Sequence, residues 1–142
     1  MSTSYETIYD LFLRKISDFD LTALEDDELE AYCGSILTSA LTRVRTMSHD
    51  LSNRDDFEFA DDLDDTEKEV IACQMVVEWA DGQLNNTQLT HMFVGTKDES
   101  MASQANHMNT LMALVHQNRA RVSTLMRDYK WTNWVKQGGN VQ

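Results

Sequence analysis

The chain has 142 residues, with 24 acidic and 12 basic side chains and a formal net charge of −12. A hydrophobic share of 42% and a charged share of 25% are typical of folded globular proteins, so the composition excludes a disordered chain and predicts one soluble domain with a modest core. The absence of proline and the presence of only five glycines argue against hairpin-rich all-β folds and favour helices.

Helix starts are marked by four Thr-x-x-Glu sequences that match the reciprocal capping box. They are Thr3–Glu6, Thr22–Glu25, Thr66–Glu69 and Thr96–Glu99. After the first, apolar residues at helical spacing predict a short amphipathic helix that starts at Tyr5 and ends near Lys15 or Ser17. After the second, a full apolar stripe from Leu29 to Val44 predicts another helix.

The middle of the chain is expected to be an acidic, solvated loop between residues 49 and 65, followed by the most buried helix. In residues 70–80 apolar side chains surround the helix almost completely, which is typical of the central helix of a small bundle. This run contains Gln74 and Glu78 and is well below the roughly 20 residues that cross a bilayer, so no membrane role is expected. A separate short element over residues 86–93 should follow, and Gly95 should break the chain.

The last predicted helix has a heptad seam of positions alternately four and three apart, which are apolar except where Arg119 interrupts the series. The seam residues are Met101, Ala105, Met108, Met112, Val115, Arg119, Val122, Met126 and Tyr129. A rod of that length exceeds what a domain of this size needs for its own core, so part of it should project or meet a partner. We expect its first half in the core and its second half at a subunit interface that includes Arg119, Arg121, Val122, Met126 and Arg127.

The sequence therefore predicts an all-α fold. It is a bundle of about four to five helices over residues 1–128, with one long C-terminal helix, followed by an extended arm over residues 129–142. In the arm, Trp131 and Trp134 lie beside cations, a composition typical of interface anchors, and we interpret it as a protein-docking segment. Packing back on the body and contact with a membrane surface are the alternatives.

The charge is distributed unevenly along the chain. Residues 1–100 contain 7 basic and 23 acidic side chains, net −16, whereas residues 101–142 contain 5 basic and 1 acidic, net +4. Ends of opposite sign are what a head-to-tail contact between identical subunits would use.

Neither a catalytic nor a metal site is expected. The acidic loop lacks the central glycine and the alternating acids of an EF-hand, so it is interpreted as a solvated face. His49-Asp50 resembles the dipeptide of HD phosphohydrolases, but no H-x-x-x-H or H-E-x-x-H spacing accompanies it. Cys33 and Cys73 lie on apolar faces and are interpreted as packing residues. With no signal-peptide pattern at the N-terminus, they favour a reducing, cytosolic origin. We expect no enzyme and no cofactor.

The order of these elements resembles head–tail connector proteins, the neck or adaptor proteins of tailed bacteriophages. The resemblance rests on the capped helices, the segment 50–56, the buried helix ending Glu78-Trp79, and the segment 103–107 that opens the long helix. It implies a ring of identical subunits, twelve in that family, in the neck of a virion assembled in the host cytoplasm. Such a ring docks beneath the portal protein, extends the DNA channel and contacts another neck or tail-completion protein.

The resemblance also implies two sets of site residues. A C-terminal segment that grips the portal would correspond to Tyr129, Lys130, Trp131, Trp134, Val135 and Lys136. An acidic channel lining, past which duplex DNA slides without specific binding, would correspond to Asp55, Asp56, Glu58, Asp61, Asp62, Asp64 and Asp65. An acidic DNA-mimic inhibitor of a DNA-binding protein remains the main alternative, because it would also be small, helical and acidic. A helical phosphohydrolase centred on His49 and Asp50 is a further one.

Overall fold

The computed structural model describes residues 2–16, 26–44, 49–93 and 98–136, and it describes no side chains in 86–104 or 130–136. Within these ranges the chain is mostly helical, which confirms the predicted all-α class at that level, with one short two-stranded sheet. The elements are β1 (Thr3–Ser4), α1 (Tyr5–Lys15), α2 (Asp26–Leu41), β2 (Glu58–Phe59), α3 (Asp65–Phe93) and α4 (Asp98–Lys136).

The first strand fixes the N-terminus to the acidic loop. Thr3 pairs with Phe59 in the antiparallel β1–β2 sheet. The Thr3 hydroxyl donates to the Asp61 carbonyl at 2.9 Å and accepts from the Leu63 amide at 2.8 Å. The hydroxyl is therefore not free to cap α1, and Ser4 caps it by accepting from the Glu6 amide at 3.3 Å. The capping box predicted at Thr3 is wrong by one residue because Thr3 is used in a contact distant in sequence.

The start of α3 is also displaced from the prediction. The Asp64 carboxylate accepts from the Glu67 amide at 2.8 Å, and the Glu67 carboxylate accepts from the Asp64 amide at 3.1 Å. These two bonds form a reciprocal capping box in which aspartate takes the place of threonine. The box predicted at Thr66–Glu69 is therefore wrong by two residues.

Helix α3 is the centre of the core, as predicted. Every residue from Val70 to Ala80 except Glu78 is buried. The side chains of Cys33 and Cys73 are buried free thiols, which confirms their packing role. The separate element predicted over 86–93 is wrong, because α3 continues without a break to Phe93.

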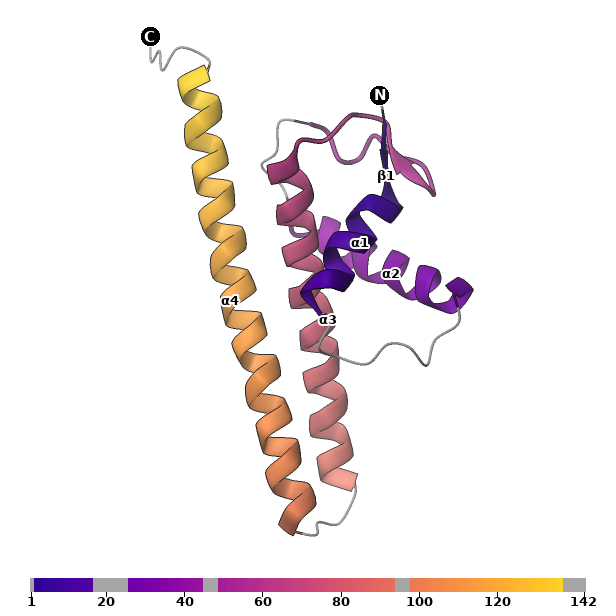
Figure 1. Cartoon of the computed structure of the whole chain (residues 1–142), viewed down its shortest axis with the longest axis vertical. Coiled ribbons are helices and arrows are strands. Elements are labelled where there is room, and N and C mark those ends of the chain that lie inside the picture. Colours follow the sequence, from indigo (N-terminus) through magenta and orange to yellow (C-terminus); the bar gives the residue numbers. More distant parts are fainter. Residues whose placement is uncertain (1, 17–25, 45–48, 94–97, 137–142) are drawn as a thin grey trace.

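Figure 1 shows how the helices are arranged around α3. Helix α4 runs beside α3 as the second arm of a long hairpin, while α1 and α2 pack on α3 from the other side. With 39 residues, α4 is about 58 Å long, and its C-terminal end projects past the start of α3. Residues 129–136 continue this helix, so the extended arm predicted to begin at residue 129 is helical as far as Lys136.

The seam of α4 has a different phase from the predicted one. Its buried positions include Leu111, Val115, Val122 and Tyr129, whereas Met112 is 46% exposed and Arg119 is exposed. One of the two predicted seven-residue tracks, through Val115 and Val122, is confirmed. The other lies one residue away from the predicted position, because α3 contacts the face that contains Leu111.

Candidate partner interface

The predicted acidic loop is more ordered than a solvated segment, because Phe59 and Leu63 are buried in the core. The Asp55 carboxylate accepts from the amides of Phe57 at 2.7 Å and Glu58 at 2.8 Å. These backbone hydrogen bonds hold the pKa of the Asp55 carboxyl below its ordinary value. Asp55 is therefore a turn-forming residue.

The same turn presents an aromatic side chain to solvent. The Tyr5 hydroxyl donates to the Asp55 carbonyl at 2.5 Å, and the Tyr5 amide donates to the Phe57 carbonyl at 3.0 Å. Phe57 itself is 73% exposed at the tip. The turn thus holds an exposed aromatic ring among carboxylates on a backbone fixed to α1.

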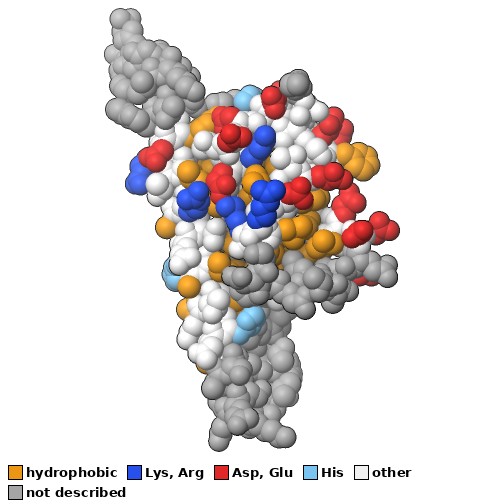
Figure 2. Space-filling view, in the orientation of Figure 1, with side chains coloured by type: hydrophobic (Ala, Val, Ile, Leu, Met, Phe, Trp, Pro, Cys, Tyr) orange, Lys and Arg blue, Asp and Glu red, His pale blue; other side chains and the backbone are white. Residues whose placement is uncertain are grey.

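The predicted channel acids lie together on the loop and the start of α3, on the side of the molecule where Figure 2 shows many of the carboxylates. Asp55, Asp56, Asp62, Asp64 and Asp65 are exposed, and Glu58 and Asp61 are half-buried. Two of the seven have structural roles, since Asp55 forms the turn and Asp64 caps α3. Glu58 accepts from the Ser2 hydroxyl at 2.8 Å, and the exposed acids, Asp55 included, also act through their charge.

The His49-Asp50 pair makes internal contacts. The His49 ring lies with Nδ1 2.6 Å from Oε1 of Glu67, a carboxylate that is completely buried. This hydrogen bond raises the pKa of His49 above its ordinary value. Asp50 accepts from the Ser52 amide at 3.0 Å and from the Ser52 hydroxyl at 2.6 Å. Within the described ranges no cluster of three or more His, Cys, Asp or Glu residues could hold a metal ion.

Glu67 is the important buried residue that the sequence analysis missed. Its carboxylate joins the residue before α3, Asp64, to His49, which lies 18 positions away. The local signal was present as Asp64-x-x-Glu67, a capping box that starts with aspartate. The partner histidine could not be found from spacing alone.

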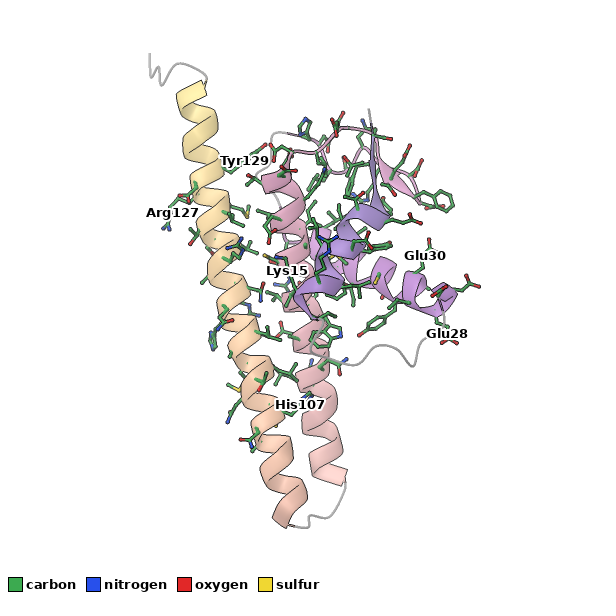
Figure 3. All side chains as sticks on the ribbon, viewed as in Figure 1. Lys15, Glu28, Glu30, His107, Arg127 and Tyr129 are labelled. Carbon is green, nitrogen blue, oxygen red and sulfur yellow. The ribbon has the colours of Figure 1, made fainter. Side chains whose placement is uncertain are left out.

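A carboxylate on α3 also connects the outer helices. Glu69 pairs with Lys15 of α1 and lies 3.5 Å from Arg121 of α4. Burial alone would raise the pKa of the Glu69 carboxyl, but the hydrogen bond and charge of Lys15 and the charge of Arg121 outweigh it, so this pKa lies below its ordinary value. Figure 3 shows Lys15 where α1 passes α3. The predicted interface residue Arg121 thus makes a contact within its own subunit.

Other predicted interface residues on α4 also make internal contacts. Arg119 pairs with Asp81 of α3 at 3.1 Å, Val122 is buried, and Met126 packs against the core. Arg127 is exposed, and Figure 3 shows it on the side of α4 that faces away from α3. Arg119 and Arg121 stay exposed beside their partners, and Arg127 is exposed on the outer side of α4.

Of the predicted portal-binding residues, Tyr129 packs on its own chain and the others lie in the last turns of α4. Tyr129 is 8% exposed and points from α4 toward the start of α3, so it packs on its own chain. Lys130, Trp131, Trp134, Val135 and Lys136 lie in the last turns of α4, and their side chains are outside the described part of the chain. The helical backbone still fixes their register. Positions 131 and 134 fall on the same face as Arg127, at i+4 and i+7, opposite Tyr129.

A groove lies between α1 and α2, which we call the α1–α2 groove. Both helices pack on α3 and leave a hollow of about 320 Å³ between them. Its lining is apolar at the floor and acidic at the rim, and consists of Glu6, Tyr9, Asp10, Leu13, Asp26, Leu29, Glu30 and Cys33. A second hollow of about 340 Å³ continues past Tyr9 to Asp55 and Asp56. The Tyr9 hydroxyl lies 3.3 Å from where a side-chain carbon would stand at Gly34, so the glycine lets this ring sit against α2.

Comparison of the chain with protein-family models, with curated protein sequences and with solved structures finds no match. None of the described helices combines the length and the apolar character that a membrane span needs. The arrangement therefore has to be interpreted from its own geometry. It combines an acidic body with an apolar groove on one side and a long projecting helix on the other.

Proposed function

We propose that this chain is a structural virion protein of a tailed phage, a subunit of a head–tail connector ring that docks under the portal and links to the next neck or tail protein. The observation that carries the proposal is the placement of an acidic, grooved body on one side of α3 and a projecting helix with a basic C-terminal sequence on the other. Surfaces of opposite charge on opposite sides suit repeated contacts between identical subunits.

The length of α4 supports the same proposal. Its C-terminal turns extend past α3 and have no neighbouring helix in Figure 1. Positions 130–136 hold two tryptophans and two lysines, a composition that is typical of an interface anchor. We assign this end, from Arg127 to Lys136, as the partner-binding end of the subunit.

The exposed acids support a role beside DNA. Carboxylates that face duplex DNA repel its phosphates, so the duplex can slide along them without sticking. In a ring, Asp55, Asp56 and Asp62 would form such a lining if the loop faces the channel.

An acidic DNA-mimic inhibitor is the second candidate, and the same exposed carboxylates favour it. A mimic presents spaced negative charges to a protein's DNA-binding groove and needs no apolar anchor at its basic end. The two functions therefore differ in what Trp131→Ala with Trp134→Ala should do. The change should abolish partner binding by a connector and leave inhibition by a mimic unaffected.

The test is the mass of the purified chain by light scattering or native mass spectrometry, alone and with a portal protein from the same source. The connector predicts a large closed ring, or capture by the portal, that weakens as salt rises, because the Debye length falls from about 10 Å at 0.1 M to about 3 Å at 1 M. A monomer that does not bind the portal protein and that displaces DNA from nucleases or repressors would refute the connector and support the mimic.

A further inference from the structure

The α1–α2 groove has the composition of an acceptor for a helix. Its floor is formed by apolar side chains, among them Leu13 and Leu29, and its rim bears the exposed carboxylates of Glu6, Asp10 and Glu30. Figure 2 shows apolar side chains bordered by carboxylates on this side of the molecule. An amphipathic helix that lays its apolar anchors into such a groove would need cations beside those anchors.

The C-terminal end of α4 has the matching composition. The helical register places positions 127, 131 and 134 on one face, and these are an arginine and two tryptophans. The i, i+4, i+7 spacing is the anchor pattern of a helix that binds in a groove. Lys130 and Lys136 add positive charge to the same turns. Two hollows that share Tyr9 in their lining offer space for two aromatic anchors.

The two surfaces are on opposite sides of one subunit. Helices α1 and α2 pack on one side of α3 and α4 lies along the other, so α4 keeps its own end away from its own groove (Figure 1). A second copy can supply a helix end for the groove and a groove for the helix end. Because every copy has one groove and one helix end, the contact is heterologous and repeats head to tail.

We propose that the α1–α2 groove of one copy receives the C-terminal end of α4 from a second copy of this chain. The proposal rests on the partner-binding role assigned above to residues 127–136, and it names the partner. Arg127 and Lys130 then face the carboxylates of Asp10 and Glu30, and Trp131 and Trp134 cover the apolar floor.

Charge reversal tests this contact in the full-length chain. Asp10→Lys with Glu30→Lys changes the groove, and Arg127→Glu with Lys130→Glu changes the helix end. Asp10 and Glu30 are exposed, so the groove variant should fold normally, which circular dichroism checks. Each double variant should raise the dissociation constant of self-association by about tenfold or more, measured by sedimentation velocity, because like charges then meet. The chain that carries all four changes should recover association.

The matched control is Asp27→Lys with Glu28→Lys, which makes the same change of net charge on exposed residues of α2 that do not line the groove. Figure 3 labels Glu28 and Glu30, the control and the test position. Equal weakening by the control and by the groove variant would overturn the proposal, as would failure of the fourfold variant to associate. A wild-type chain that stays monomeric at every concentration and binds anionic vesicles through residues 127–136 would also overturn it.

The experiments distinguish a failure of the groove contact from a failure of the proposed connector function. Recovery of association in the fourfold variant, together with a wild-type chain that a portal protein does not capture, would support the groove contact and refute the connector. Capture by the portal that the groove variant leaves intact, with no self-association in either variant or wild type, would support the connector and refute the groove contact.

Discussion

The phase of the α4 seam can be tested with two neighbouring residues. Leu111 is completely buried against the core, whereas Met112 is 46% exposed. Replacing a buried leucine by alanine removes its transfer free energy and leaves a cavity, at a cost of about 2–5 kcal/mol. We therefore expect Leu111→Ala to lower the free energy of unfolding by about 2–5 kcal/mol and the melting temperature by about 6–20 °C.

Met112→Ala is the matched control, because it truncates a side chain of similar size one position away. Half of that side chain is already in water and alanine is the better helix former, so we expect a loss below about 1 kcal/mol. Urea unfolding followed by far-ultraviolet circular dichroism measures both values. Equal losses, or a larger loss for Met112→Ala, would refute the observed phase and restore the seam predicted from the sequence.

Three further predictions concern the carboxylates of Glu67 and Glu69. Glu67→Ala removes the acceptor for the Asp64 amide and the His49 ring, so it should lower the free energy of unfolding in urea by about 2–4 kcal/mol. Glu28→Ala, at an exposed position, should change it by no more than about 0.5 kcal/mol. A loss that small for Glu67→Ala would contradict the capping role. Because Glu67 raises the pKa of His49, the ion pair stabilises the fold below the ordinary histidine pKa of 6.5 and this contribution is lost as pH rises through the raised pKa. The stability difference between wild type and His49→Gln should therefore shrink at alkaline pH. The change should be modest, because the ring is partly exposed. A difference that grows with pH would contradict the stabilising role of the ion pair. Because the pKa of Glu69 is lowered, the contribution of this carboxylate to stability is present above the ordinary pKa of 4.5 and is lost as pH falls through the lowered pKa. Glu69→Gln should therefore be less stable than wild type near neutral pH and equally stable in acid. Thermal unfolding across a pH series measures the difference.

The candidate interface was only partly accessible to sequence reasoning. The charge division and the tryptophans of the C-terminal stretch follow from residue order, so the projecting basic end could be predicted. The α1–α2 groove could not, because its lining comes from two helices that are brought together by α3. The interface role of Arg121 and Val122 stays a prediction. Spacing along α4 could not show that Arg121 lies beside Glu69 of α3 or that Val122 packs in the core.

The sequence by itself determined the helical class and the identity of the central helix. Eleven consecutive positions that are almost all apolar can be buried only where other elements surround a helix, so residues 70–80 had to form the core. The absence of proline allowed α3 and α4 to run long, although the sequence pattern suggested a separate element over residues 86–93, where α3 is continuous.

Tertiary structure decided the details that depend on a distant partner. A heptad pattern fits two adjacent tracks on α4, and only the position of α3 determines that Leu111 is buried and Met112 exposed. Thr3 and Thr66 both fit a capping box, but Thr3 bonds to the loop near residue 61 and Asp64 caps α3 together with Glu67. Local spacing gives the set of permitted contacts, and the free energy of packing against elements far away in the sequence selects among them.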